Sequence, residues 1–333
     1  MQSAIPLKNV ITWQEELKNL ISDPKELIQR LELDPNLLAA AQQACQLFPL
    51  RVSPSFLARV KKGQVNDPLL RQILPLNEEL KREIGFSDDP LEEQQFNVLP
   101  GLVHKYKNRV LHIATSSCAI NCRYCFRRSF AYEENRCGQQ QWLDILDYLH
   151  KHPEIDEFIF SGGDPLLMTD EHIRTRLSQL AAISHIQRVR WHTRIPIVLS
   201  SRITKALAKA LSHTRLQAIM VIHCNHAQEL DECVKQGLDY LHSANITLLN
   251  QAVLLRGVND CPETQIALSH SLFKNKVLPY YLHILDKVNG AAHFTVHSND
   301  AHVIYQEMRR KLSGYLLPKL VKEEAGQIAK TPL

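Results

Sequence analysis

The sequence has no apolar run long enough to cross a membrane. Every hydrophobic stretch falls short of the roughly 20 residues that a spanning helix needs, and no basic segment followed by an apolar run marks the N-terminus as a signal peptide. The net charge of +4 is too small to argue for nucleic-acid binding. Low-complexity tracts and internal repeats are also absent. With 44% hydrophobic and 22% charged residues, the chain is expected to be a globular, cytoplasmic protein that binds neither membranes nor nucleic acid.

Cysteine occurs eight times, and three of the eight lie in the run Cys118-Ala-Ile-Asn-Cys122-Arg-Tyr-Cys125. The others are scattered, which favours a reducing compartment over a disulfide framework. Structural zinc usually takes four ligands in two spaced pairs, and the next cysteine, Cys137, has no close partner in the sequence. A [4Fe–4S] cluster normally takes four thiolates, so three would leave one iron open to a small molecule. We therefore expect Cys118, Cys122 and Cys125 to hold a cluster at which chemistry takes place.

The pattern of the sequence changes along the chain. Roughly the first 90 residues are helical in pattern, with helix starts at Asp23-Pro24 and Asp34-Pro35. From about residue 109 onward, short β-rich runs alternate with amphipathic segments of helix length. The expected strands cover 109–114, 157–160, 188–192, 217–223, 247–255 and 277–284, and the expected helices cover 139–151, 171–183, 205–213, 227–243 and 263–274.

Six β–α repeats indicate a parallel sheet with right-handed crossover connections. Six repeats are fewer than the eight of a closed TIM barrel, so the predicted fold class is α/β, a partial (β/α)6 TIM-like barrel. We expect three regions: an N-terminal helical region (1–95), the partial barrel (96–290), and a C-terminal helix with a tail (291–333).

Polar groups collect at the predicted C-terminal ends of these strands, which is where such barrels carry their active sites. The three cysteines follow the first strand, and Ser161-Gly162-Gly163-Asp164 follows the second. His223 ends the fourth strand, Gln251 lies in the fifth, and Asp286 follows the sixth. We expect all of these side chains to face one opening.

Several of these residues also have plainer explanations. Two adjacent glycines let a backbone approach a ligand closely, but they also occur in ordinary β–α turns. Arg127 offers a planar fork that can grip a carboxylate, or it belongs to a solvated basic surface. His223 is either a ligand or a packed strand residue, and Lys330, judged from its neighbours alone, is a disordered terminal lysine. The local residues leave these alternatives open.

The CxxxCxxC spacing, with Tyr124 inside it, resembles the radical S-adenosylmethionine (SAM) superfamily. From about residue 89 to residue 330 the chain further resembles the lysine 2,3-aminomutase family, because the order and spacing of several motifs match without gaps. The matching elements are 118–128, 161–166, 254–262, 279–281 with Asp286, 313–315 and 330–332.

The resemblance implies three cofactors: a [4Fe–4S] cluster, SAM and pyridoxal 5′-phosphate (PLP). The open iron would bind SAM, and the cluster, reduced by an external one-electron donor, would cleave it to a 5′-deoxyadenosyl radical. PLP would be held as a Schiff base by Lys330, the implied catalytic residue, so the tail must fold over the barrel mouth. By the same resemblance, SAM contacts Ser161, Gly162, Gly163, Asp164, His223 and Gln251, and PLP contacts Arg109, Lys105 and Tyr106 as well as Lys330.

The implied substrate is L-lysine, which undergoes a 1,2-amino shift. Arg127 would bind its carboxylate, and Asp286 and Glu323 its remote ammonium. The short C-terminus further resembles the family member that makes (R)-β-lysine, which a ligase then attaches to elongation factor P. A functional link to that factor and its ligase follows from this resemblance.

The chain departs from the family at three places. Glu323 stands where the family has aspartate, and 324–329 replaces a glycine-rich loop. Cys261 matches a family zinc ligand whose partner cysteines are missing, so structural zinc is not expected. Two other functions stay open: an aminomutase for another amino acid such as glutamate, and a non-catalytic iron–sulfur sensor or binding protein.

Overall fold

The computed structural model describes residues 12–327 and 329–333. Residues 1–11, which open the predicted helical region and include the segment searched for a signal peptide, lie outside the described residues, as does Ile328 of the tail. Within the described ranges, no helix is both long and apolar enough to cross a membrane.

Ten strands of the described residues form one sheet in the order of the sequence. The six strands from β3 to β8 run parallel, and β9 continues them in parallel, whereas β1, β2 and β10 add antiparallel strands at the two ends. The predicted α/β class with a mostly parallel sheet is therefore confirmed. The strands are β1 Asn97–Leu99, β2 Leu102–Tyr106, β3 Arg109–Thr115, β4 Glu157–Gly162, β5 Arg188–Thr193, β6 Gln217–Ile222, β7 Thr247–Leu254, β8 Leu278–Ile284, β9 Lys319–Lys322 and β10 Thr331–Pro332.

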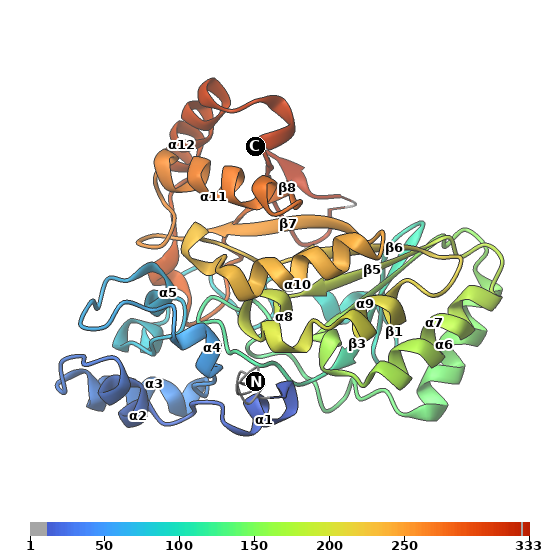
Figure 1. Cartoon of the computed structure of the whole chain (residues 1–333), viewed down its shortest axis with the longest axis horizontal. Helices are drawn as coiled ribbons and strands as arrows, with labels where there is room; N and C mark the ends of the chain where they lie inside the picture. The colour runs from blue at the N-terminus through green and yellow to red at the C-terminus, as the bar shows by residue number, and fades with distance from the viewer. Residues whose placement is uncertain (1–11, 328) are drawn as a thin grey trace, which may run out of the picture.

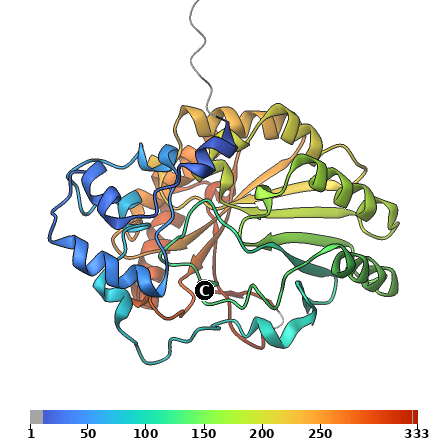
Figure 2. The same ribbon diagram turned by 90° about the horizontal axis from the view of Figure 1, so that it is seen from below.

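Alternation along the strands separates the two faces of the sheet. Phe158 of β4 points outward and packs edge-on against Trp142 of helix α6 (Gln139–Lys151), with ring centroids 5.8 Å apart. The next residue, Ile159, points inward and lines a cavity, as does Arg190, its partner on β5. Because side chains alternate with a period of two, one face binds helices while the other is free to form a site. Figure 2 shows the green-to-orange helices along the outer rim of the strands and the C-terminus on the inner side.

The helices that connect the parallel strands follow them as the β–α pattern predicts. They are α6 Gln139–Lys151, α7 Asp170–Ala182, α8 Ile195–Val198, α9 Lys205–Leu211, α10 Glu232–Ser243, α11 Pro262–Lys274 and α12 Ser298–Lys311.

The N-terminal helices lie against one side of the barrel (Figure 1) and share its hydrophobic core, to which Phe56 and Leu70 contribute fully buried side chains. Proline opens α2, α4 and α5, each behind an aspartate or serine that caps the helix. These helices are α1 Trp13–Lys18, α2 Pro24–Arg30, α3 Leu37–Leu47, α4 Pro54–Leu57 and α5 Pro68–Arg71.

The structure differs from the expected elements at several places, including the short helix α8 between β5 and α9, which was not expected. The helix expected over 227–243 is divided into a 3-10 turn, Ala227–Glu229, and α10, because the Asp231 side chain accepts from the Val234 amide and caps a new helix start. Strands β1 and β2 were not expected. The tail adds β9 and β10 to the sheet, and this pairing brings Lys330 to the inner face.

Candidate functional site

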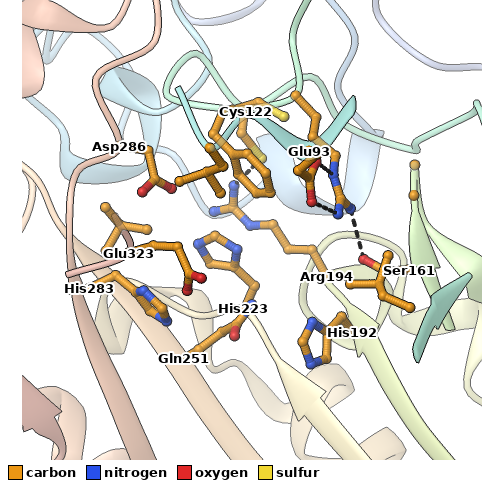
Figure 3. Close-up of a pocket in the computed structure, with 18 of the residues that line it drawn as sticks. Glu93, Cys122, Ser161, His192, Arg194, His223, Gln251, His283, Asp286 and Glu323 are labelled. Atoms are coloured by element: carbon orange, nitrogen blue, oxygen red, sulfur yellow. Dashed lines mark hydrogen bonds and ion pairs between the residues drawn. The ribbon is translucent and has the colours of Figure 1, made fainter. Parts of the chain in front are cut away.

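One cavity of about 840 Å³ lies at the C-terminal ends of the parallel strands. Every residue to which the sequence assigned a role lines it, including the three cysteines and Lys330, which are more than 200 positions apart in the sequence. The cavity was therefore assembled by the sheet and not by any local motif. Figure 3 shows part of this wall, with Cys122, Ser161, His223, Asp286 and Glu323 directed toward a common space.

The cysteine loop follows β3 and is anchored by the N-terminal helical region. Arg123, inside the motif, is fully buried and donates from Nε to Glu79 Oε1 at 2.8 Å. Arg128 donates to the other oxygen of Glu79, also at 2.8 Å, and the Arg123 amide donates to the Gln72 carbonyl at 3.0 Å. Breaking a buried ion pair leaves an uncompensated charge, which is strongly destabilising. The contacts of Arg123 and Arg128 with Glu79 therefore fix the position of the cysteine loop.

The three cysteine thiols all face the cavity and form no disulfide. Among the described residues, no three His, Cys, Asp or Glu side chains gather as a single metal ion would require. A cubic cluster offers its ligands separate iron corners, so its thiolates need not meet at one point. The donor set, three soft sulfurs on one braced loop, fits an iron–sulfur cluster.

The glycine pair permits a close approach between two loops. The Gly163 amide donates to the Thr115 carbonyl at 2.6 Å, and the Asp164 amide to the Ser117 carbonyl at 2.8 Å. Gly162 has a φ of +106°, and a Cβ there would lie 2.8 Å from the Thr115 carbonyl oxygen. Any larger residue would force the loop after β4 away from the base of the cysteine loop.

The Asp164 carboxylate is committed to the protein itself. It accepts from Thr193 Oγ1 at 2.6 Å and from the Arg194 amide at 2.7 Å. Burial raises its pKa to about 6 even against these hydrogen bonds. Through its carboxylate, Asp164 therefore ties the end of β4 to the end of β5.

Arg194 is a site residue that the sequence analysis missed. Its Nη1 lies 2.7 Å from Cys122 Sγ, and its Nη2 donates to Gln72 Oε1 at 2.6 Å and to Glu229 Oε2 at 3.1 Å. Arg194 lies just beyond the third predicted strand, and that strand end was given no functional residue. The position of Arg194 at the C-terminal end of a predicted strand was the signal that could have identified it as a site residue.

Arg127 is held by an acidic partner that was also missed. It donates from Nε to Glu93 Oε2 at 2.8 Å and from Nη2 to Glu93 Oε1 at 2.6 Å, and its Nη1 donates to Ser161 Oγ at 3.0 Å. Burial opposes its charge, but the Glu93 carboxylate outweighs that cost and raises the pKa of Arg127. A ligand carboxylate at Arg127 would have to compete with Glu93.

The tail residues form an ion cluster at the opposite wall. Glu323 accepts from Lys105 Nζ at 3.1 Å and Tyr106 Oη at 2.8 Å through Oε1, and it pairs with Lys330 Nζ through Oε2. Burial works against its charge, but the Lys330 ammonium and these donors lower the pKa of Glu323 to about 2. Arg109 stacks on the Tyr106 ring, with 3.9 Å from Cζ to the centroid. The predicted PLP contacts are thus gathered around one carboxylate.

Four polar atoms in the cavity wall have no partner among the described residues. They are Asp286 Oδ1, His192 Nε2, His283 Nε2 and Arg194 Nε, each of them buried. His223, in contrast, has Tyr124 Oη within 3.3 Å of its Nε2. Burial raises the pKa of Asp286 to about 7, although the Lys330 ammonium opposes the shift. Orphaned buried acceptors are costly, and they are a feature of sites built for a ligand.

Replacing Asp286 with asparagine should stabilise the cofactor-free chain. The pKa of Asp286 rises from 3.8 to about 7 on folding, so between these values the unfolded chain loses a proton that the folded chain keeps, and stability falls as pH rises. Asparagine cannot ionise. We expect Asp286→Asn to raise the free energy of unfolding by about 2–4 kcal/mol at pH 8 and by less than half of that at pH 5, measured by denaturant titration.

The matched control is Asp239→Asn on α10, whose exposed carboxylate pairs with Lys276 Nζ at 2.9 Å. The pKa of Asp239 is lowered, chiefly by its hydrogen bond to Lys276, so its removal should give no gain at either pH. If the Asp286→Asn variant were no more stable than the parent at pH 8, burial of the Asp286 carboxylate would not raise its pKa as stated.

The fold and the three-thiol cavity define the class of protein. The profile of the Radical SAM superfamily matches residues 113–267, which span β3 to α11 and include the cysteine loop, Asp164 and Arg194. That superfamily uses a [4Fe–4S] cluster and SAM.

Full-length relatives define the family within that class. The chain is 49% identical to the L-lysine 2,3-aminomutase of Escherichia coli K12, over 96% of this chain and 94% of that protein. It is 46% identical to the enzyme of the same name from Haemophilus influenzae over equal shares, and 32% identical to that of Clostridium subterminale over 96% of this chain and 77% of that protein. The chain belongs to the lysine 2,3-aminomutase family, whose members are isomerases.

Proposed function

We propose that this protein is a PLP-dependent radical SAM aminomutase that converts L-lysine to (R)-β-lysine in the cytoplasm, and that its product serves to modify a lysine of elongation factor P. One observation carries the proposal. Lys330 and the three cysteines, at opposite ends of the catalytic region, line the same cavity. An aminomutase of this kind needs its hydrogen-abstracting group and its amine-carrying group within one enclosure.

The residues present fit both kinds of cofactor. Lys330 offers an amine at the cavity wall, and Lys105 and Tyr106 already hold an anionic group, the Glu323 carboxylate, beside it. Cationic and hydroxyl donors of this kind suit a phosphate. Ser161, Gly163 and His223 contact residues of the cysteine loop or of the end of β3 before it, where SAM would contact the cluster. Gly162 and Gln251 line the same cavity.

The charges of the cavity suit a zwitterionic amino acid with a second ammonium. Arg127 provides the fork for a carboxylate, and Asp286 has an unpartnered oxygen that a cation would satisfy. Glutamate would place a negative charge where Asp286 and Glu323 lie, which disfavours it as the substrate. These side chains bind and orient, and the walls exclude water.

When bound, the reduced cluster with SAM supplies a hydrogen-abstracting radical, and PLP supplies a carbonyl that can carry an amino group between adjacent carbons. The chain contributes distance and orientation. Arg194 holds Cys122, Glu79 holds the cysteine loop through Arg123, and the pairing of β9 with β8 holds the tail. Loosening these supports should uncouple SAM consumption from product formation.

Anaerobic reconstitution tests the proposal. Protein loaded with iron, sulfide, PLP, SAM and a reductant should convert free L-lysine, and chiral analysis should show the (R) product. Omission of iron or of PLP should abolish the product. Full activity without PLP would refute the proposed role of Lys330. Turnover of free lysine in the absence of elongation factor P separates this reaction from direct action on the factor, and supplying the product to a factor-modifying ligase tests the downstream link.

A further inference from the structure

Glu93 belongs to the connector that joins the N-terminal helices to the sheet, and its side chain lines the cavity. The connector, residues 87–96, runs beside the loop after β8, where the Ser87 amide donates to the Lys287 carbonyl at 2.9 Å. Glu93 begins a 3-10 turn, and its amide donates to Asp89 Oδ1 at 3.2 Å. These contacts fix the backbone from which the Glu93 carboxylate reaches into the cavity.

The contact with Glu93 takes up some of the donors of Arg127 and leaves others free. A guanidinium carries five N–H donors. Glu93 accepts from Nε and Nη2, and Ser161 accepts from Nη1. Two donors, one on Nη1 and one on Nη2, thus have no partner within the part of the chain that the structure describes. Two N–H groups on neighbouring nitrogens form the fork that binds a carboxylate through both oxygens, so Glu93 and a substrate carboxylate can contact Arg127 together.

Hydrogen bonds, and not packing, set the direction of these free donors. The Arg127 side chain is 6% exposed, and its Cζ lies 4.9 Å from the centre of the Phe126 ring and 5.8 Å from that of Phe130. An aromatic ring attracts the charge without fixing the direction of any one N–H group, whereas a hydrogen bond is directional. Glu93 and Ser161 therefore determine where the remaining N–H groups point.

The charge of Glu93 argues for a role in orientation and against one in attraction. Glu93 and Arg127 form a neutral pair, so a substrate carboxylate competes with Glu93 for the charge of the guanidinium although it uses different donors. A guanidinium that only attracted the carboxylate would bind it more strongly without this neighbour. Figure 3 shows Glu93 and Ser161 on one side of the cavity and Asp286 and Glu323 on the other. The direction of the Arg127 donors therefore decides where a bound amino acid lies between the two sides.

We propose that Glu93 is a positioning residue, which holds the Arg127 guanidinium so that its two remaining N–H donors direct the carboxylate of the substrate. The reacting carbons lie next to that carboxylate, so the direction of these donors sets their distance from the cluster. The family resemblance gave Glu93 no role. This inference rests on the proposed aminomutase function and adds a residue that acts on its substrate site through Arg127.

The first test measures lysine turnover and SAM cleavage together in the reconstituted holoenzyme of Glu93→Ala. Loss of Glu93 removes an ordering contact and a repulsive charge, which have opposite effects on lysine binding, so KM should stay within about threefold of the parent. Misplaced carbons react slowly, and we expect kcat to fall roughly ten- to a hundredfold. The 5′-deoxyadenosine released per β-lysine should rise by a similar factor. Glu93→Gln keeps one acceptor oxygen and should give intermediate values.

The second test detects the contact without any turnover. Phenylglyoxal reacts with the uncharged form of a guanidinium. Burial opposes the charge of Arg127, but the Glu93 carboxylate outweighs this effect and raises the pKa of Arg127. Without that carboxylate the uncharged form is more abundant, so Arg127 in the cofactor-free Glu93→Ala chain should be modified roughly tenfold faster or more. Mass spectrometry with peptide fragmentation assigns the adduct to residue 127.

Two control variants separate positioning from loss of an ion pair. Glu133 pairs with Arg136 at 2.7 Å on the same stretch of chain, but both side chains are exposed, so Glu133→Ala should change neither readout. Asp170 pairs at 2.7 Å with Arg202, whose side chain is 1% exposed, and neither residue lines the cavity. Asp170→Ala should lower the thermal stability and leave the ratio of 5′-deoxyadenosine to β-lysine as in the parent.

Three results would overturn the inference and leave the proposed function intact. They are an unchanged kcat and 5′-deoxyadenosine ratio in Glu93→Ala, a similar rise of that ratio in Asp170→Ala, and equal rates of phenylglyoxal modification of Arg127 in Glu93→Ala and the parent. A parent holoenzyme that does not convert lysine would instead contradict the proposed function, and the modification rates would still show whether Glu93 holds Arg127.

Discussion

Lys330→Ala should abolish covalent attachment of PLP and, with it, all β-lysine formation. Lys330 Nζ pairs with Glu323, lies 5.8 Å from the centre of the Tyr281 ring, and borders the cavity that contains the cysteines. Among the described lysines, two others line the cavity: Lys105, which lies on β2 and donates to Glu323, and Lys319, which begins β9. Borohydride treatment of the PLP-loaded protein should fix the cofactor to the peptide that contains residue 330, and mass spectrometry should find no such adduct in the variant.

Lys322→Ala is the matched control on the same tail. Lys322 belongs to β9, pairs with Glu324 at 2.8 Å and does not line the cavity. Its loss should leave the adduct and the activity in place. An adduct that persists at another lysine in Lys330→Ala, together with turnover, would show that the tail is not the cofactor anchor.

Replacing any one of Cys118, Cys122 and Cys125 with alanine should remove the cluster and reduce product formation below detection. Three thiolates are the smallest set that leaves a single iron open, so a chain with two cannot hold the same cluster in the same state. Iron and sulfide analysis after anaerobic reconstitution, together with the visible absorbance of the cluster, should show a near-complete loss in each variant.

The remaining cysteines provide controls within the same chain. Cys233 and Cys261 are exposed and lie outside the cavity, so Cys233→Ala and Cys261→Ala should load iron as the parent does. If Cys261→Ala lost iron while Cys118→Ala kept it, the assignment of the cluster to the loop after β3 would be wrong.

The alternation of strands and helices was predictable because it depends on the local periodicity of apolar residues along the sequence. Alternating apolar residues specify a strand and 3.6-residue repeats specify a helix before any tertiary contact forms. Elements whose identity depends on pairing were not predictable. Strand β1 is only three residues long, and β10 covers two, so their structure comes from the neighbours they pair with and not from their own sequence.

The same division applies to the site. The cysteine spacing is a local pattern that indicates a cluster by itself, whereas the roles predicted for the Ser161–Asp164 turn and for Lys330 came from the family motifs. The acidic partners of Arg194 and Arg127 could not be predicted from neighbouring residues, because Glu229 and Glu93 each lie more than 30 positions away in the sequence. Asp164 lines the cavity as expected, and the structure adds that its carboxylate accepts hydrogen bonds from Thr193 and the Arg194 amide.

The sequence by itself determined the parts of this protein that depend on covalent spacing: three thiols on one loop, a glycine pair that admits a close backbone, and the order of strands and helices. The tertiary structure decided which charges are satisfied. Glu323 accepts from Lys105, Tyr106 and Lys330, whereas Asp286 Oδ1 and His283 Nε2 have no partner among the described residues. Burial and hydrogen bonding depend on how distant segments pack, and the spacing of residues along the sequence does not say which distant donor reaches which acceptor.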